Sequence, residues 1–385
     1  MDSIYLDHNA TTTVYPEVAE AMARCFAAGY ANPASQHRPG QQARRLLEDA
    51  RGDVAGILGA DLSGTRPDRL IFTSGGTEAN NLALLGIAGA RGGPEPGHVV
   101  ISAIEHASVI GAAEYLLDLG WRVDSLGVTP QGIVRTERLR ALLAPETRLV
   151  SVIAANHEIG TIQPIEELAA ICAEFGVPLH TDAVQRAGKL PVDFRSLGVA
   201  AMTVAAHKFH GPLGIGALIV RGDVPIQPVL FGGHQQEGLR PGTESIALAV
   251  GMRTALEVFQ REQDEALRRT TTLRERFESG LRAGWPGLIV HGADAPRLPN
   301  TSNVAFPGLD AQVLFTALDT GGVACSVGSA CASGSSELSP TLLALGLPKD
   351  IVRSSLRFST GSTTTQAEID EAVRRILDVC AQVRA

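Results

Sequence analysis

The chain has 385 residues, of which 44% are hydrophobic, 19% charged and 4% aromatic, a composition that excludes a disordered, collagenous or coiled-coil chain as a whole. The net charge of −8 and the lack of a basic block argue against nucleic acid or an anionic membrane as the main partner. At about 100–200 residues per domain, this length predicts about two domains.

The first two thirds of the chain alternate between short apolar strands and helical patterns. Strands rich in β-branched and apolar residues are predicted over 70–73, 98–104, 149–155, 177–181, 200–205 and 216–220. Helical periodicity covers 78–90, 108–119 and 164–175. Uninterrupted apolar strands separated by helices are typical of a parallel sheet covered on both faces, which predicts an α/β fold.

The pattern changes near Thr243, which is a candidate N-cap for a long helix from residue 244 to about 282. Weaker strands over 303–306 and 355–358 and a closing helix over 366–383 follow. A long helix of this kind often joins two domains. We therefore predict a large domain over about 15–258 and a small domain built from 1–14 and 259–385.

Three polar clusters directly follow predicted strands, where ligands bind in open α/β sheets. Residues 73–78 (TSGGTE) combine glycines with a helix start, which suits an oxyanion, although they also read as an ordinary turn with a threonine N-cap. Asp182 either keeps a ring nitrogen protonated or caps a helix. Lys208, before a Gly-Pro turn, is either a partly buried amine able to form a Schiff base or a lysine extended along the surface. Together, a phosphate cradle, a carboxylate and a lysine 26 residues later are what a pyridoxal phosphate site requires.

The five cysteines and residues 1–10 indicate the cellular compartment that the sequence predicts. The five cysteines are scattered, odd in number and include no C-x-x-C pair, which argues against a disulfide framework or a zinc site. Residues 1–10 lack the features of a signal peptide, and no apolar run approaches the about 18–20 residues of a membrane-spanning helix. We therefore expect a cytoplasmic protein with no bound metal and no membrane partner.

The order of the motifs along the whole chain resembles a known family. The motifs are YLDHNATT at 5–12, NPAS at 32–35, TSGGTEANN at 73–81, EH at 105–106, NHEIG at 156–160, DAVQ at 182–185, HK at 207–208, GSAC at 328–331 and SSLRFS at 354–359. They resemble those of the cysteine desulfurases of the NifS/IscS type, which are class V aminotransferases of fold-type I and depend on pyridoxal 5'-phosphate. The resemblance implies a large domain with a mostly parallel, seven-stranded sheet covered by helices, and a smaller α/β domain from both chain ends.

The resemblance also implies how the ring of the cofactor is held. Lys208 would form the Schiff base, and Asp182 would pair with the pyridinium nitrogen. His106 would stack on the ring and exchange protons with the substrate or a thiol. Asn156 and Gln185 would bond to the ring oxygen.

The phosphate group would be bound by Gly76, Thr77 and His207. Thr243 of a second subunit would complete this site, which implies a homodimer. Ala205 departs from the family, because many relatives have a serine there whose hydroxyl contacts the phosphate. The loss of one hydrogen bond of this kind is worth about 0.5–1.5 kcal/mol.

The substrate and the sulfur are assigned to a third group of residues. Arg357, with help from Asn32, would bind the substrate carboxylate, a task that suits the planar guanidinium. Cys331, on a loop at about 323–338 rich in small residues, would be the catalytic cysteine, whereas Cys325 is expected to be structural. The spacing of 26 positions from Cys331 to Arg357 resembles the subgroup with a long loop, in which the cysteine travels to hand sulfur to a protein acceptor.

The implied activity is the conversion of L-cysteine to L-alanine. The sulfur would pass to Cys331 as a persulfide and then to acceptor proteins, such as an iron–sulfur scaffold. Two alternatives stay open on the same fold, a selenocysteine lyase and an aminotransferase. A third alternative is a non-catalytic protein that keeps the fold, against which the intact Lys208, Asp182 and Cys331 argue.

Overall fold

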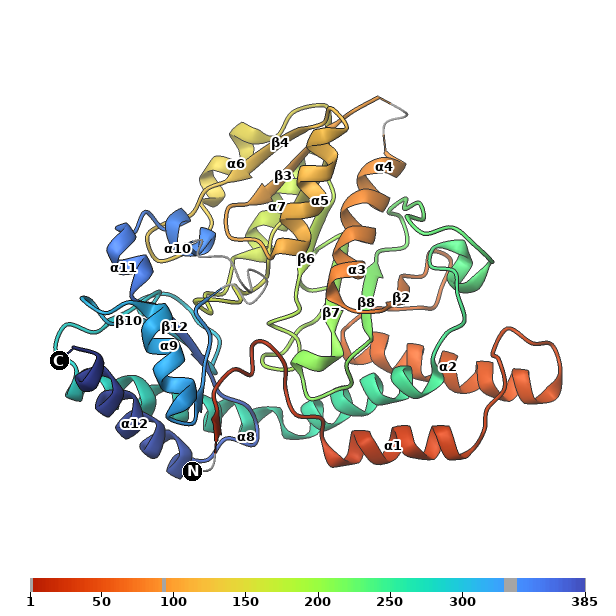
Figure 1. Ribbon diagram of the computed structural model, residues 1–385. Helices are drawn as coiled ribbons and strands as arrows, with labels where there is room; N and C mark the ends of the chain where they lie inside the picture. Colours follow the sequence, from red (N-terminus) through yellow and green to blue (C-terminus); the bar gives the residue numbers. More distant parts are fainter. Residues whose placement is uncertain (1–2, 92–94, 329–337, 385) are drawn as a thin grey trace.

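A seven-stranded sheet forms the centre of the computed structural model, which describes residues 3–91, 95–328 and 338–384 (Figure 1). In spatial order its strands are β2 (Arg69–Thr73), β8 (Gly216–Val220), β7 (Ala201–Ala205), β6 (Leu179–Asp182), β5 (Thr147–Ser151), β3 (His98–Ser102) and β4 (Arg122–Leu126). From β7 through β6, β5 and β3 to β4 all neighbours are parallel, whereas β8 is antiparallel to both β7 and β2. The mostly parallel α/β sheet that we expected is therefore confirmed.

Strand β8 is antiparallel because it follows β7 without a crossover helix. Residues 206–215 between them form only a short 3-10 turn, η2 (Ala206–Lys208), and a Gly-Pro turn. A parallel neighbour needs a crossover connection of about a dozen residues or more, usually with a helix. The short connection therefore returns the chain antiparallel and leaves Lys208 just beyond the end of β7.

The edge strand β4 was missing from the sequence prediction. Its sequence, RVDSL, has only two apolar residues, and its side chains are mostly partly buried or exposed. Charged residues on an edge strand oppose pairing with other chains, but they also remove the apolar run by which a strand is recognised. The six predicted strands, by contrast, each coincide with a strand of the structure.

Helices cover both faces of this sheet. They are α1 (Pro16–Ala27), α2 (Arg38–Ile57), α3 (Gly76–Asn81) with a π-helical turn η1 (Leu82–Ile87) and α4 (Ala88–Ala90), α5 (Ala107–Asp118), α6 (Thr136–Leu142) and α7 (Ile165–Glu174). The predicted helix over 78–90 is thus continuous through its π-helical turn. None of the helices in the described part of the chain is both long and apolar enough to cross a bilayer.

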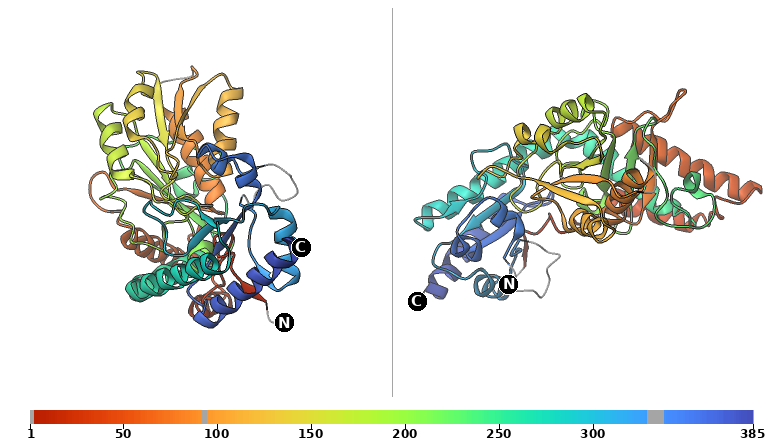
Figure 2. Two further views of the ribbon diagram at one scale, coloured as in Figure 1. Left: turned by 90° about the vertical axis from the view of Figure 1, so that its left-hand side faces the viewer. Right: turned by 90° about the horizontal axis from the view of Figure 1, so that it is seen from above.

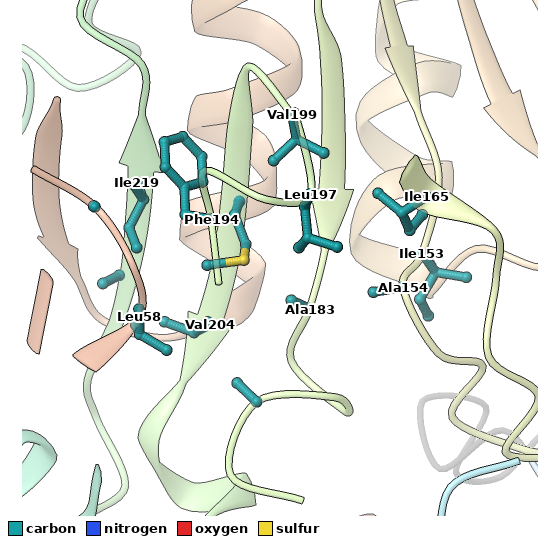
Figure 3. Close-up of a cluster of buried hydrophobic side chains, with 14 of the residues drawn as sticks. Leu58, Ile153, Ala154, Ile165, Ala183, Phe194, Leu197, Val199, Val204 and Ile219 are labelled. Carbon is teal, nitrogen blue, oxygen red and sulfur yellow. The ribbon is translucent and has the colours of Figure 1, made fainter. Parts of the chain in front are cut away.

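In β2, β3, β5, β7 and β8, neighbouring residues enter two different hydrophobic clusters, as the two-residue period of a strand requires. In β2, Ile71 packs in the cluster that also contains α5 residues, whereas Leu70 and Phe72 pack in the cluster on the opposite face. Figure 3 shows part of the latter cluster, including Val204 from β7 and Ile219 from β8. This two-sided burial explains why the central strands read as continuous apolar runs.

A second hydrophobic core joins both chain ends. It lies around the antiparallel sheet β12 (Ser355–Ser359), β10 (Thr301–Ala305) and β9 (Ile289–Val290), and the parallel pair β1 (Ile4–Tyr5) and β11 (Val323–Ala324). Helices α9 (Ala311–Thr320) and α12 (Gln366–Arg384) pack in this second core, whereas α10 (Pro340–Ala344) and α11 (Lys349–Arg353) contribute buried residues to a cluster of the large sheet. Figure 2 shows both chain ends beside the second core. The domain boundaries that we expected stay a prediction.

Helix α8 (Ile246–Gly284) extends from the core of the large sheet to the second core, as Figure 1 shows. At about 1.5 Å per residue its 39 residues span about 58 Å. It packs against α1 and α2 and also against α12. The long helix predicted after Thr243 is confirmed, but Thr243 as its N-cap was wrong. Ser245 is the N-cap, and its Oγ accepts from the N–H of Leu248, one turn inside the helix.

A buried ion pair ties α8 to the second core. Arg297 donates to both carboxylate oxygens of Glu278 at 2.8 and 3.1 Å, and Ser302 of β10 donates to the same group at 2.7 Å. The two charged side chains are only 7% and 8% exposed. Burial by itself raises the pKa of Glu278, but the hydrogen bonds and charge of Arg297 outweigh it and hold the pKa below its ordinary value.

We predict that Arg297→Ala lowers the free energy of unfolding by about 3–5 kcal/mol, because it leaves the Glu278 carboxylate buried without its partner. Urea denaturation measures the loss. Arg374→Ala is the matched control, because Arg374 pairs with Glu371 on the surface, where solvent screens the pair, and its loss should leave the free energy of unfolding almost unchanged. Equal losses in the two variants would contradict the assignment.

Candidate active site

A cavity of about 270 Å³ lies at the edge of the large sheet where the strands end. β6 ends at Asp182 and β7 at Ala205, and α3 and α5 begin close to the ends of β2 and β3. Ligands of open α/β sheets bind at this edge, and pockets for small molecules typically have about 300–1,000 Å³. The predicted site residues that line the cavity are Gly76, Thr77, His106, Asp182, Gln185, His207, Lys208 and Arg357.

Lys208 enters the cavity from η2, directly after β7. Its Nζ donates to the backbone carbonyls of Asn9 and Ala10 at 2.6 and 2.8 Å. The segment that follows β1 therefore supplies the acceptors for a lysine almost two hundred residues later. The fold thus holds the amine at the cavity wall, not in bulk solvent.

Asp182 is 3% exposed and is held by two donors. Its Oδ2 accepts from Asn80 Nδ2 at 2.7 Å, and its Oδ1 accepts from the N–H of Val184 at 2.9 Å. Asn80 comes from α3 and also donates to Ser108 Oγ of α5. These bonds fix the carboxylate group at the cavity, whichever of the two predicted roles it has.

His106 is the N-cap of α5. The N–H of Ser108 donates to its Nδ1 at 3.1 Å, so a neutral ring carries its proton on Nε2. The ring meets that of His157 edge to face, with centroids 5.2 Å apart. The pKa of His157 is held well below its ordinary value by burial and by the nearby His106, Arg357 and Lys208, which keeps this second imidazole neutral.

The first turn of α3 meets the end of β7 at the phosphate side predicted from the sequence. A Cβ atom added to Gly76 would lie 3.0 Å from Val184 Cγ2 and 3.6 Å from Ala205 Cβ. Ala205 therefore lines the same part of the cavity as Gly76. Burial and the positive charges of Lys208 and Lys189 lower the pKa of His207 to about 4, so this ring is neutral near pH 7.

Gln185 and Asn156, the two residues expected at the ring oxygen, have different positions. Gln185 lines the cavity and donates through Nε2 to the backbone carbonyl of Asn9 at 2.9 Å. Asn156 is fully buried and does not line it. Its amide donates to the carbonyl of Ile104 and accepts from the N–H groups of Glu158 and Ile159. The predicted cofactor contact of Asn156 stays a prediction.

Arg357 of β12 is buried and reaches the cavity from the second core. Its Nη2 donates to Asp7 at 2.6 Å, and its Nη1 donates to the carbonyls of His157 and Gly328. These three acceptors hold the guanidinium without using its Nε. Asp7 lies in the first motif of the sequence, but its pairing with Arg357 joins residues 350 positions apart and has no signal in the local pattern.

Besides Asn156, two predicted site residues in the described part of the chain, Asn32 and Thr243, do not line this cavity. Asn32 is exposed and accepts from the N–H of Ala34. Thr243 is exposed and lines a different cavity together with Ser74 and Gln236. Cys331 lies outside the described residues.

The structure adds residues that the sequence prediction did not assign to the site. Asn9, Asn80, Ser108 and His157 all line the cavity. Each stands inside or next to a motif that was recognised, so the signal was available. Their roles depend on contacts with distant segments, however, and a motif does not reveal such contacts.

Three cavity side chains keep a buried polar atom without a partner in the described part of the chain. These atoms are Asn80 Oδ1, His157 Nδ1 and Arg357 Nε. A buried polar group without a hydrogen bond costs about 1–3 kcal/mol. The cavity is therefore suited to a polar ligand that supplies both donors and acceptors.

Comparisons with known proteins agree with this geometry. The family model described as Aminotransferase class-V matches residues 4–372. The IscS-like cysteine desulfurase of Mycobacterium tuberculosis is 41% identical over 386 aligned positions, which cover 99% of this chain and 97% of the relative. A solved NifS-like protein superimposes with a TM-score of 0.91 at 34% identity, covering 99% and 100% of the two chains. A structure described as SspA in complex with cysteine has a TM-score of 0.81 at 31% identity, covering 94% and 100%.

Proposed function

Because this chain belongs to the class V aminotransferase family, we propose that it is a pyridoxal-phosphate-dependent cysteine desulfurase. Its relative from Mycobacterium tuberculosis is named as such an enzyme, and the similar SspA structure contains cysteine. In the proposed reaction L-cysteine becomes L-alanine. The sulfur passes to Cys331 as a persulfide and from there to an acceptor protein, such as an iron–sulfur scaffold.

The observation that carries this proposal is the meeting of Lys208, Asp182 and His106 at one cavity. Asp182 is the last residue of β6, and Lys208 and His106 follow the ends of β7 and β3. A lysine amine, a buried carboxylate and an imidazole are the groups that a pyridoxal phosphate enzyme needs around the ring. A protein that merely kept the fold would have no use for this combination.

The residues at the cavity fit the cofactor. The first turn of α3 offers backbone N–H groups of Gly76 and Thr77 to a phosphate, and the neutral ring of His207 can donate one N–H. Asp182 can hold a proton on the pyridine nitrogen, and Gln185 can donate to the ring oxygen. When bound, the cofactor withdraws electrons from the α-carbon of an amino acid and so makes its proton removable.

Lys208 and Arg357 have the direct roles toward the substrate. Lys208 would carry the cofactor through Nζ, yield it to the substrate amine and then take the proton from the α-carbon. Arg357 Nε, which has no partner among the described residues, would donate to the substrate carboxylate. Asn32 is proposed as a second contact of that carboxylate.

The sulfur transfer needs a cysteine that is a thiolate near pH 7. The thiolate of Cys331 would attack the substrate sulfur and form an S–S bond. The electron pair of the broken C–S bond would stay with the substrate carbon, which takes up a proton and leaves as alanine. Burial, together with the nearby Asp7 carboxylate, raises the pKa of Cys325 to about 12, so this thiol is a poor nucleophile.

A homodimer is part of the proposal. Thr243 is exposed at a distance from its own cavity, which supports the role expected for it in the phosphate site of the partner subunit. Phe231, on the segment before it, is 84% exposed and offers an apolar contact for a second copy. The cytoplasmic location expected from the sequence stays a prediction.

The function is tested by incubating the full chain with pyridoxal phosphate and L-cysteine. We expect alanine to form, and sulfide to form when a reductant is present. Alanine from L-selenocysteine alone would redirect the assignment to a selenocysteine lyase, and transfer of the amino group to a keto acid would redirect it to an aminotransferase. A protein that gains no visible absorption from the cofactor would contradict the whole proposal.

We predict that Lys208→Ala abolishes the covalent attachment of the cofactor, because no other lysine lines the cavity in the described part of the chain. The visible spectrum and borohydride reduction followed by peptide mapping measure it. Lys349→Ala, an exposed lysine in α11, is the control and should retain the attachment. A reduced adduct mapped to a lysine other than Lys208 in the unchanged protein would refute the assignment.

We predict that Cys331→Ala binds the cofactor and still changes its spectrum on addition of L-cysteine, but forms no alanine beyond background. The reason is that the thiol acts only after the substrate has bound. Cys325→Ala should retain turnover, because Cys325 is buried and protonated. The opposite pattern, with Cys331→Ala active and Cys325→Ala inactive, would show that the wrong cysteine has been chosen.

We predict that Ala205→Ser tightens cofactor binding up to about tenfold, since one hydrogen bond is worth about 0.5–1.5 kcal/mol. Thr203 cannot fill this role, because it does not line the cavity and its hydroxyl pairs with His180 Nε2 at 3.0 Å. The measurement is the dissociation constant of the cofactor in phosphate-free buffer. Ala201→Ser, at the other end of β7, should give no tightening. Equal constants for Ala205→Ser and the unchanged protein would mean that residue 205 does not face the phosphate.

A further inference from the structure

Lysine is rare in this chain, and two of its lysines meet at the candidate active site. Lysine and arginine number 33 in total, of which only Lys189, Lys208 and Lys349 are lysines. Lys349 is exposed in α11. Lys189 and Lys208 both line a small second cavity of about 40 Å³, which adjoins the first one at Lys208. Lys208 has an assigned role, whereas Lys189 has none.

Lys189 contacts two residues that line the first cavity but does not line that cavity itself. Its Nζ donates to Asn9 Oδ1 at 2.9 Å and to Gln185 Oε1. Burial and the nearby charges of Lys208 and Arg357 hold its pKa well below the ordinary value. Placing an amine here is therefore costly to the fold, which calls for an explanation in terms of what the amine binds.

The contact of Lys189 determines which way the amide of Gln185 points. A primary amide has a donor end and an acceptor end of nearly equal size, and its hydrogen-bond partners decide between the two orientations. As an ammonium, Lys189 can only donate, so it binds the Oε1 end, in agreement with the Asn9 carbonyl, which can only accept and binds the Nε2 end. The Nε2 end then faces Asn9, whose carbonyl accepts from it at 2.9 Å, and the cavity that Gln185 and Asn9 share.

We propose that Lys189 is a positioning residue, which fixes the Gln185 amide so that its N–H donor faces the cofactor ring oxygen. This inference rests on the proposed function, because it concerns the same cofactor. In the reversed orientation Oε1 would face a negatively charged ring oxygen and repel it. Lys189 thus acts through Gln185 and does not touch the cofactor.

The contact with Asn9 extends the same effect toward Lys208. The Asn9 carbonyl accepts from both Gln185 Nε2 and Lys208 Nζ, while its side-chain oxygen accepts from Lys189. Asn9 therefore accepts a hydrogen bond from each of these three side chains. Loss of the Lys189 contact removes a hydrogen bond that holds the side chain of Asn9. Gln185 and Lys208 both depend on the backbone carbonyl of this residue.

The test compares Lys189→Met with Lys349→Met in the full chain. Methionine keeps most of the apolar side chain and removes the donor. We expect Lys189→Met to weaken pyridoxal phosphate binding about tenfold and to shift the visible absorption of the bound cofactor. Lys349→Met should do neither. Unchanged binding and spectrum in Lys189→Met would overturn the proposal.

A double-mutant cycle with Gln185→Ala separates positioning from a general structural role. If Lys189 acts mainly through Gln185, Lys189→Met should weaken cofactor binding much less once Gln185→Ala is present, and only the contact with Asn9 remains to be lost. If the two effects simply multiply, Lys189 acts independently of Gln185 and the proposal is wrong. Thermal unfolding of each variant shows whether the fold is intact.

Gln185→Glu keeps the inference testable if Lys189→Met fails to fold. The new carboxylate would pair with Lys189, so the fold should be retained, but it would turn an acceptor toward the ring oxygen. We therefore expect Gln185→Glu to bind the cofactor more weakly than Gln185→Ala. Binding as tight as in the unchanged protein would overturn the proposal. Failure of the unchanged protein to bind pyridoxal phosphate would instead contradict the proposed function itself.

Discussion

The backbone carbonyl of Asn9 is the acceptor around which the candidate active site is arranged. It accepts hydrogen bonds from Lys208 Nζ at 2.6 Å and from Gln185 Nε2 at 2.9 Å, which lie on segments that follow strands of the large sheet. The same residue donates to Thr301 and is bound through its N–H to Ser359, both in the second core. One buried residue therefore joins the two cores at the place where the cavity lies. Displacing it would move the lysine, the glutamine and the small sheet together.

Burial decides which ionisable side chains around the cavity are charged near pH 7. The histidines at 157 and 207 have pKa values far enough below their ordinary value to be neutral near pH 7. Arg357 is neutralised in part by Asp7, and its Nε remains for an acidic group. The cavity thus combines neutral donors with a few placed charges, which is suited to a phosphorylated cofactor and a zwitterionic amino acid.

Much of the large sheet could be predicted because its central strands are buried on both faces. Such strands read as apolar runs, and five of the six strands predicted in this sheet are of this kind. The sixth, β2, lies at the other edge but is buried along almost its whole length. The edge strand β4 has a polar face toward solvent, so its pattern is lost among loops. The N-cap of α8 was misplaced by two residues, since Thr243 and Ser245 are both good caps and only the backbone path selects Ser245. Asp7, Asn9 and Lys189 were missed as parts of the site because their partners are far away in the sequence.

The sequence alone determined the α/β class, the long helix, the family resemblance and the residues expected at the cofactor, because these depend on local patterns and motif order. The tertiary structure decided which of those residues meet. It brings Lys208, Asp182, His106 and Arg357 to one cavity and turns the side chain of Asn156 to the backbone instead. The physical reason is that hydrogen bonds and burial depend on distances between segments. A carbonyl at residue 9 can hold a lysine at residue 208 only once both cores have formed.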